Sequence, residues 1–212
     1  MRLNWLNGKG NEKEKLRKKM KELRERMAAE DVVQKSIAIA NKLKLLAEYK
    51  EAKAVLFYAA KGNEVQTWQL ISEAITKKKK ALLPITDMKN RELKVAETSE
   101  YPKGLVEGKF GIMEPEKRTT FPEGEIDLAI IPGVAFSEEG YRLGYGLGFY
   151  DKLISRLRSE RVNIRKIGLA YDFQIVDKIP KQEHDQRMDM IITEKKVIRP
   201  RILGENGRAQ RI

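Results

Sequence analysis

The sequence predicts an α/β fold with an open, mostly parallel sheet covered by helices on both faces, a Rossmann-like arrangement of three layers. Two observations carry this prediction. Short, continuously apolar runs rich in β-branched residues alternate with segments whose apolar residues recur at helical spacing. Strands that are apolar on both faces are typical of parallel sheets buried between helices. The N-terminal helices are expected to pack alongside this sheet.

Two helices are expected before the first strand. Residues 12–27 carry one apolar stripe on a charged segment, formed by Leu16, Met20, Leu23 and Met27. Asp31 is a candidate cap for a second helix. Its main apolar stripe is expected to be Val33, Ile37 and Ala40, widened by Val32, Ile39, Leu43 and Leu46.

Short apolar runs predict the strands, at residues 52–58, 80–84, 92–97, 127–131, 167–170 and 189–193. The run at 92–97 is expected near an edge of the sheet, and 99–124 is expected to be rich in loops. A helix is predicted over 67–78 with Trp68, Ile71 and Ile75 facing the core, and another from Phe149 to Leu157. Ligands of an open α/β sheet bind at the carboxyl ends of its strands. The segments that follow residues 58, 131 and 170 are therefore the places to look for chemistry.

Composition narrows the class of protein. The 212 residues fit a single domain, 1–212, with flexible tails expected over 1–11 and 199–212. The absence of cysteine excludes disulfides and thiolate chemistry, and the single histidine, His184, excludes a multi-histidine metal site within one chain. The sequence contains no run of about 18 apolar residues, so no membrane span is predicted. The cytoplasm is the expected location. A net charge of +12 favours anionic partners.

The strongest local signal is a glycine-rich segment. Gly140, Gly144, Gly146 and Gly148 follow a predicted buried strand and precede a predicted helix. Such glycines allow positive φ angles, and successive backbone N–H groups at a helix N-terminus form an anion-binding nest. Arg142 adds a guanidinium suited to phosphate oxygens. A tight turn without a ligand is the alternative, and neither a GxGxxG dinucleotide motif nor a P-loop is present.

Three carboxylates lie near these segments. Asp151 follows the glycines and is either a residue of the first helical turn, favoured by the helix dipole, or a ligand of Mg²⁺ beside bound phosphates. Asp185 lies next to His184 in a polar segment, 180–189, before a predicted strand. Glu64 follows the first predicted strand. Taken singly, Asp185 is better explained as an ordinary hydrogen-bonded loop residue, and Glu64 as an ordinary exposed one.

Four blocks occur in a specific order: KEKLR (13–17), NEVQT (63–67), PGVAFSEEGYRLGYGLGFYD (132–151) and PKQEHDQRMDMIIT (180–193). Together they resemble the 5-formyltetrahydrofolate cyclo-ligase family, over about residues 13–193. The resemblance implies an enzyme that converts 5-formyltetrahydrofolate and ATP to 5,10-methenyltetrahydrofolate, ADP and phosphate with Mg²⁺. The formyl oxygen would be phosphorylated, and ring closure would expel phosphate.

The resemblance also implies roles for individual residues. Tyr150 and Arg142 would be catalytic, and Asp151 and Asp185 would hold the metal. Glu64, Ala59 and Tyr150 would contact the folate. The ATP site would comprise Lys13, Arg17, Arg142, Leu143, Gly144, Tyr145, Gly146, Leu147, Gly148, Phe149 and Tyr150.

Two positions depart from the family pattern. Tyr145 stands where some members have arginine, and Leu147 stands where members often have lysine, arginine or glycine. Phosphate binding would then depend on Arg142, Lys13, Arg17 and backbone N–H groups. The basic charge leaves two alternatives open, a nucleic-acid-binding protein and a nucleotide-binding α/β module without folate chemistry. No nucleic-acid-binding motif stands out, so nucleic-acid binding is expected to be absent or non-specific.

Overall fold

The computed structural model of the 212-residue chain describes residues 3–160, 164–180 and 185–200. Within these residues one main sheet has seven strands in the order β12–β11–β9–β6–β1–β2–β3. Their bounds are β1 (Ala54–Leu56), β2 (Lys80–Asp87), β3 (Glu92–Thr98), β6 (Leu128–Ile131), β9 (Arg165–Leu169), β11 (Met190–Ile192) and β12 (Val197–Ile198). The strands from β11 to β2 pair in parallel, whereas the edge strands β12 and β3 pair antiparallel. The predicted fold class, a mostly parallel α/β sheet, is confirmed.

The strands are buried on both faces because their side chains alternate between two cores. In β6, Leu128 and Ile130 belong to one core cluster, whereas Ala129 and Ile131 belong to the other. This period-two division is what a sheet between two helical layers requires. It also explains why the strands read as continuous apolar runs instead of alternating patterns.

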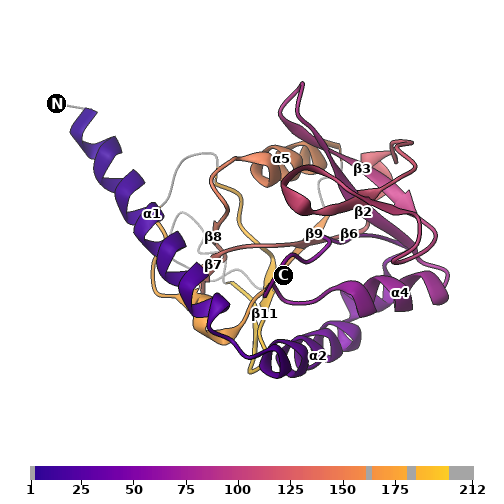
Figure 1. Ribbon diagram of the computed structural model, residues 1–212, viewed down its shortest axis with the longest axis horizontal. Helices are drawn as coiled ribbons and strands as arrows, with labels where there is room; N and C mark the ends of the chain where they lie inside the picture. The colour runs from indigo at the N-terminus through magenta and orange to yellow at the C-terminus, as the bar shows by residue number, and fades with distance from the viewer. Residues whose placement is uncertain (1–2, 161–163, 181–184, 201–212) are drawn as a thin grey trace, which may run out of the picture.

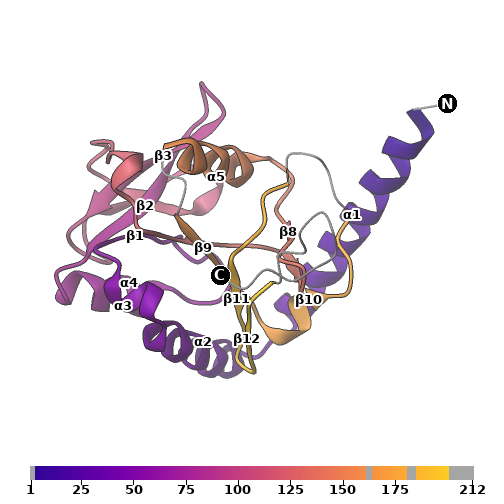
Figure 2. The ribbon, with the colours of Figure 1, turned by 180° about the vertical axis from the view of Figure 1, so that it is seen from behind.

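Helices cover both faces of the sheet (Figures 1 and 2). The first core lies under α2 (Ala29–Leu45), α3 (Ala47–Glu51) and α4 (Trp68–Thr76). The second lies under α5 (Phe149–Glu160), which contributes Leu153, Ile154 and Leu157. The sheet and the helices packed on its two faces form three layers.

Helix α1 (Leu3–Glu25) packs beside the sheet rather than on it, and its first turns project from the body (Figure 1). Met20 packs against Val134, Leu143 and Ile179 around a small sheet in the order β10–β7–β8. These strands are β7 (Ala135–Ser137), β8 (Arg142–Leu143) and β10 (Ile175–Val176). Residues 3–11, where we expected a tail, are part of this helix, whereas most of the expected C-terminal tail, 201–212, lies outside the described residues.

Several local expectations need correction. Ala28, not Asp31, is the N-cap position of α2, and Asp31 lies in its first turn. The buried stripe of α2 contains Val32, Ser36, Ile39, Ala40 and Leu43, whereas Val33 and Ile37 are exposed. Trp68 was expected in the core but is 51% exposed at the start of α4. The buried face of α4 includes Ile71 as expected, so only Trp68 was placed wrongly there, whereas the buried stripe of α2 runs through the residues that were expected only to widen it.

The loop-rich region 99–124 contains short elements. A hairpin is formed by β4 (Leu105–Glu107) and β5 (Met113–Pro115), with η1 (Lys109–Gly111) between them. The remaining short 3₁₀ turns are η2 (Glu123–Glu125) and η3 (Asp172–Gln174). The hairpin places Phe110 and Ile112 near the carboxyl ends of the central strands, where the candidate site lies.

The order of strands reverses between β1 and β6. From β1 the chain proceeds outward through β2 and β3, whereas from β6 it proceeds in the opposite direction through β9 and β11. At such a switch point the connections from the two adjacent strands run in opposite directions. This leaves a crevice outside the carboxyl ends of the strands. Residues that follow β1 and β6 are thereby placed beside one another.

Candidate active site

A cavity of about 920 Å³ lies at this switch point, bounded by α1 on one side. Ligand pockets in proteins commonly span about 300–1,000 Å³, so this one can hold large ligands. The segments that line it come from α1, the loop after β1, the β4–β5 hairpin and the glycine-rich segment. From α1 these are Asn11, Glu14, Lys15, Arg17, Lys18, Met20, Lys21, Arg24 and Glu25; the other main contributions are Lys61–Glu64, Phe110, Ile112, Arg142 and Gly144–Asp151.

Arg142 is a buried cation in the wall of the cavity. Its side chain is only 2% exposed. The guanidinium donates to the carbonyl oxygen of Pro132 at 3.2 Å and to Oδ1 of Asp151. Its Nε has no hydrogen-bond partner among the described residues. Because unpaired buried donors are rare, this atom is suited to a ligand that supplies an acceptor.

The glycines shape the backbone of this wall. Gly146 and Gly148 have φ angles of 100° and 73°, a region that other residues rarely adopt. A Cβ at Gly144 would lie 2.8 Å from Nη1 of Arg142. Helix α5 begins at Phe149, directly after the glycines. A helix N-terminus behind a close-lying glycine backbone can bind an anion.

Two residues of α1 make contacts with distant parts of the chain. One contacts the glycine-rich segment, and the other contacts the segment that precedes β11. Arg17 donates through Nε to the carbonyl oxygen of Gly144 at 2.9 Å. Lys13 Nζ lies 3.3 Å from Oδ2 of Asp185, and both side chains are largely buried. The structure thus brings Arg17 to the glycine-rich segment, and Lys13 to Asp185. His184 lies outside the described residues.

Glu64 forms a polar cluster with Tyr145 and Arg24. The hydroxyl of Tyr145 donates to Oε1 of Glu64, and Nη1 of Arg24 donates to that hydroxyl at 3.0 Å. The backbone N–H of Lys61 donates to Oε2 of Glu64 at 2.8 Å. Burial, followed by the charge of Glu64, raises the pKa of Tyr145 well above its usual value. Tyr145 therefore stays a neutral hydrogen-bond donor at neutral pH.

Tyr150 lines the cavity beside Arg142. Its ring lies under the guanidinium of Arg142, with 5.8 Å from Cζ to the ring centroid. Burial raises the pKa of Tyr150 far above its usual value, and the charge of Glu64 acts in the same direction. A neutral phenol at this place can donate a hydrogen bond to an oxygen of a ligand.

The carboxylates near the cavity suit a metal ion that is bound partly by the protein and partly by a ligand. Among the described residues no group of three or more acidic, histidine or cysteine side chains lies close enough to hold a metal ion. Mg²⁺ is commonly bound by one or two carboxylates together with phosphate oxygens and water. Asp151, which lines the cavity beside Arg142, fits that role. Asp185 is paired with Lys13 and is absent from the described lining of the cavity.

Two expected residues lie behind the wall. Ala59 is 5% exposed and belongs to the core under α2 and α4. Leu143 is 2% exposed and packs against Met20 of α1. Within the described part of the chain neither lines the cavity. Tyr145 and Leu147, where the sequence departs from the family pattern, both line it and are about half exposed.

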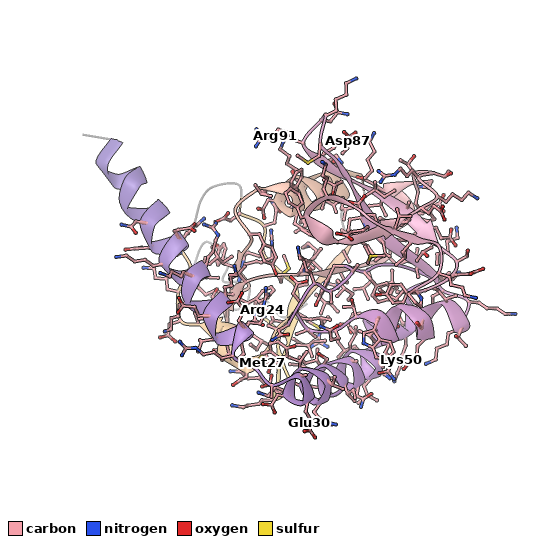
Figure 3. The ribbon with its side chains drawn as sticks, viewed as in Figure 1. Arg24, Met27, Glu30, Lys50, Asp87 and Arg91 are labelled. Carbon is pink, nitrogen blue, oxygen red and sulfur yellow. The ribbon has the colours of Figure 1, made fainter. Side chains whose placement is uncertain are left out.

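Sequence reasoning missed Arg24 and Asn63. Arg24 lies at the end of α1 that meets the body, near the turn into α2 marked by Met27 and Glu30 (Figure 3). Asn63 donates through Nδ2 to the carbonyl oxygen of Arg24 at 3.0 Å. Seven residues, or two helical turns, separate Arg24 from Arg17. That spacing places both on one face of α1 and is the signal that could have identified Arg24.

Comparison with known proteins identifies the family. A profile of the 5-formyltetrahydrofolate cyclo-ligase family matches residues 9–194, which is most of the chain. The chain belongs to the 5-formyltetrahydrofolate cyclo-ligase family. Among its relatives, a probable 5-formyltetrahydrofolate cyclo-ligase of Schizosaccharomyces pombe is 34% identical over 77% of this chain and 86% of that protein. The cyclo-ligase of Mus musculus is 26% identical over 84% and 92%. The expectation of an enzyme of this family is confirmed.

Solved structures of cyclo-ligase relatives have the same fold. The 5,10-methenyltetrahydrofolate synthetase of Aquifex aeolicus is 34% identical, with a TM-score of 0.77 over 94% of this chain and 96% of that one. A synthetase from Mycoplasma pneumoniae is 24% identical with a TM-score of 0.68, covers 86% of this chain and 98% of its own, and supports the fold alone. Among the described residues of this chain, no helix is both long and apolar enough to cross a membrane.

Proposed function

We propose that this chain catalyses the ATP- and Mg²⁺-dependent conversion of 5-formyltetrahydrofolate to 5,10-methenyltetrahydrofolate, releasing ADP and phosphate. Membership of the cyclo-ligase family supports the overall reaction. The observation that carries the proposal is that one cavity joins Glu64, in the loop after β1, to the glycine-rich segment with Arg142 and Asp151. A folate and a nucleotide bound at these two ends would meet at Tyr150. The cytoplasm is the location we expect for this enzyme.

The nucleotide would lie against the glycine-rich segment. Its phosphates would accept hydrogen bonds from backbone N–H groups at the start of α5 and from the unpaired Nε of Arg142. Arg17 and Lys13 would add positive charge from α1. Mg²⁺ bound at Asp151 would neutralise charge on the phosphates, as metal ions do in phosphoryl transfer. Asp185 would contribute by holding Lys13 in place, or as a second metal ligand once ATP competes for that lysine.

The folate would lie toward Glu64. A carboxylate accepts hydrogen bonds from N–H groups, which the pterin ring of a reduced folate presents. The hairpin residues Phe110 and Ile112 would supply apolar contact. The phenol of Tyr150 would donate to the formyl oxygen or to the phosphate that it receives.

The reaction would then depend on positioning the two substrates and neutralising the charge of the phosphates, and not on a protein nucleophile. The formyl oxygen attacks the γ-phosphorus, and the bond from phosphorus to the ADP oxygen breaks. The carbon of the resulting N5-iminium phosphate is attacked by N10, which loses its proton. The C–O bond then breaks, phosphate leaves with the electron pair, and the methenyl bridge remains. Phosphorylation is required because an amide oxygen is a poor leaving group, and holding both substrates in line supplies much of the acceleration.

The decisive experiment follows the near-UV absorbance of the methenyl product. Purified protein is mixed with 5-formyltetrahydrofolate, ATP and Mg²⁺, and parallel samples omit ATP or the metal. Product should form only in the complete mixture. A folded protein that produces no signal in any mixture would refute the proposal. A rise in melting temperature with ATP but not with the folate would instead indicate a nucleotide-binding module.

A further inference from the structure

Arg24 links α1 to the two segments that form the folate end of the cavity. Its Nη1 lies 3.0 Å from the hydroxyl of Tyr145 and 3.8 Å from Oε1 of Glu64. Its guanidinium carbon lies 5.8 Å from the centroid of the Tyr145 ring. The side chains of Arg24 and Glu64 are only 15% and 11% exposed. The contact is therefore part of the cavity wall and not a solvated surface pair.

The direction of each hydrogen bond in this cluster is determined by chemistry. A guanidinium has donors and no acceptor, so the Tyr145 oxygen accepts from Arg24. The single proton of the phenol is then directed to Oε1 of Glu64, while Oε2 accepts from the N–H of Lys61. Both oxygens of Glu64 are thereby held. Without Arg24, the Tyr145 hydroxyl would be free to rotate away from the carboxylate.

The backbone of Arg24 is held by the same loop. Asn63, next to Glu64, donates to the carbonyl oxygen of Arg24 at 3.0 Å. The same carbonyl oxygen, in the last turn of the helix, also accepts from the backbone N–H of Met27 at 3.2 Å. Arg24 and Glu64 also line a second cavity of about 10 Å³ behind the first, next to Tyr58. Arg24 is thus fixed through its main chain as well as its side chain.

We propose that Arg24 is a positioning residue that orients the Glu64 carboxylate through the Tyr145 hydroxyl and thereby sets the affinity for the folate substrate. This inference rests on the proposed function, in which Glu64 binds the folate. It assigns α1 two roles at two places. Arg17 contacts the glycine-rich segment at Gly144, and Arg24, two turns later, acts at the folate end.

The test compares Arg24→Gln, Tyr145→Phe and the double variant with the wild type. A matched control is Lys19→Gln, which removes the same charge from an exposed position of α1. The measurements are kcat, the KM values for folate and ATP, and equilibrium binding of 5-formyltetrahydrofolate without ATP. A hydrogen bond to a charged group contributes about 1.5–3 kcal/mol, so Arg24→Gln should raise the folate KM by about tenfold or more. The ATP KM should change less than about twofold, and the control should match the wild type.

Coupling provides the readout that a merely structural role would not give. If Arg24 acts through Tyr145, the double variant should be no weaker for folate than the worse single variant. Arg24→Lys should restore part of the affinity, because lysine still donates to the hydroxyl but lacks the planar group over the ring. Effects of the two substitutions that multiply would overturn the proposal, as would a rise in the ATP KM alone.

Failure of the inference and failure of the proposed function differ in this experiment. An active wild type with unchanged folate binding in Arg24→Gln overturns the inference and leaves the function intact. A wild type that binds folate without turnover overturns the function, and the binding arm alone then decides the role of Arg24. A wild type that does not bind folate overturns both.

Discussion

Lys13 Nζ lies 3.3 Å from Oδ2 of Asp185, although 172 positions separate the two residues in the chain. Their side chains are 12% and 11% exposed. The ion pair attaches α1 to the segment that precedes β11. Together with the Arg17–Gly144 hydrogen bond, it holds α1 against the body. The wall that α1 forms therefore depends on a few polar contacts as well as on Met20.

Lys13→Met should destabilise the protein and weaken ATP binding. Exposed ion pairs contribute up to about 1 kcal/mol, and breaking buried ones costs about 3–5 kcal/mol, so a loss of about 1–3 kcal/mol is expected for this largely buried pair. Urea unfolding measures the loss, and steady-state kinetics measure the ATP KM, which should rise. Lys19→Met, at an exposed position of the same helix, should change neither. Equal stability of the two variants would contradict a contribution from the pair.

Asp151→Asn should strongly reduce turnover while preserving the fold. The asparagine oxygen can still accept from Nη2 of Arg142, so the wall keeps its geometry, but the charge that would bind Mg²⁺ is lost. We expect kcat to fall by about 100-fold or more, since metal-ion stabilisation of developing charge contributes several kcal/mol. The assay is the near-UV absorbance at saturating ATP over a range of Mg²⁺ concentrations. Circular dichroism and the melting temperature serve as the controls for folding.

Asp177→Asn makes the same substitution at an exposed carboxylate and should leave kcat and the Mg²⁺ dependence unchanged. Full activity of Asp151→Asn at ordinary Mg²⁺ concentrations would remove Asp151 from the metal site. Asp185 would then be the carboxylate to examine next.

The main sheet could be predicted because each central strand is a continuous apolar run, and such runs report burial on both faces. The small sheet β10–β7–β8 was missed because strands of two or three residues carry no period. The glycine-rich segment was found because its φ requirements restrict the residue type. The spacing from Arg17 could have identified Arg24, but its contacts with Glu64 and Tyr145 could not be predicted, since they join three segments that meet only in the folded chain.

Helix α2 illustrates a different limit. Val33 and Ile37 form one apolar row at helical spacing, and Val32, Ile39 and Leu43 form another. Either row could face a core, because the sequence of an isolated helix does not specify where the sheet lies. In the fold Ile39 is fully buried, whereas Ile37 is 37% exposed. The position of the sheet, and not the strength of either stripe, decides between them.

This difference predicts unequal costs for one substitution at two nearby positions. Ile39→Ala should lower the free energy of unfolding by about 2–5 kcal/mol, because it removes buried methyl groups and leaves a cavity. Ile37→Ala should cost less than about 1 kcal/mol, since its side chain is partly solvated. Both are measured by urea unfolding. Equal losses would mean that Ile37 is covered in solution.

Tyr49 should make the protein sensitive to alkaline pH. It is 2% exposed, and its hydroxyl has no hydrogen-bond partner among the described residues. Burial, with a smaller effect from Glu73, raises the pKa of Tyr49 to about 12, compared with about 10 in an unfolded chain. Because the folded state holds the proton more tightly, the stability from this residue is complete below pH about 10 and is lost between about 10 and 12.

Tyr49→Phe should remove this sensitivity. At about pH 8 the variant should be as stable as the wild type or up to about 2 kcal/mol more stable, because an unpaired buried hydroxyl is costly. At about pH 11 the difference should grow by about 1.4 kcal/mol, as follows from the separation of the two pKa values. Urea unfolding followed by circular dichroism at both pH values gives the two differences. A variant less stable than the wild type at about pH 8 would show that the hydroxyl is hydrogen-bonded in solution, and the pH dependence would then have another source.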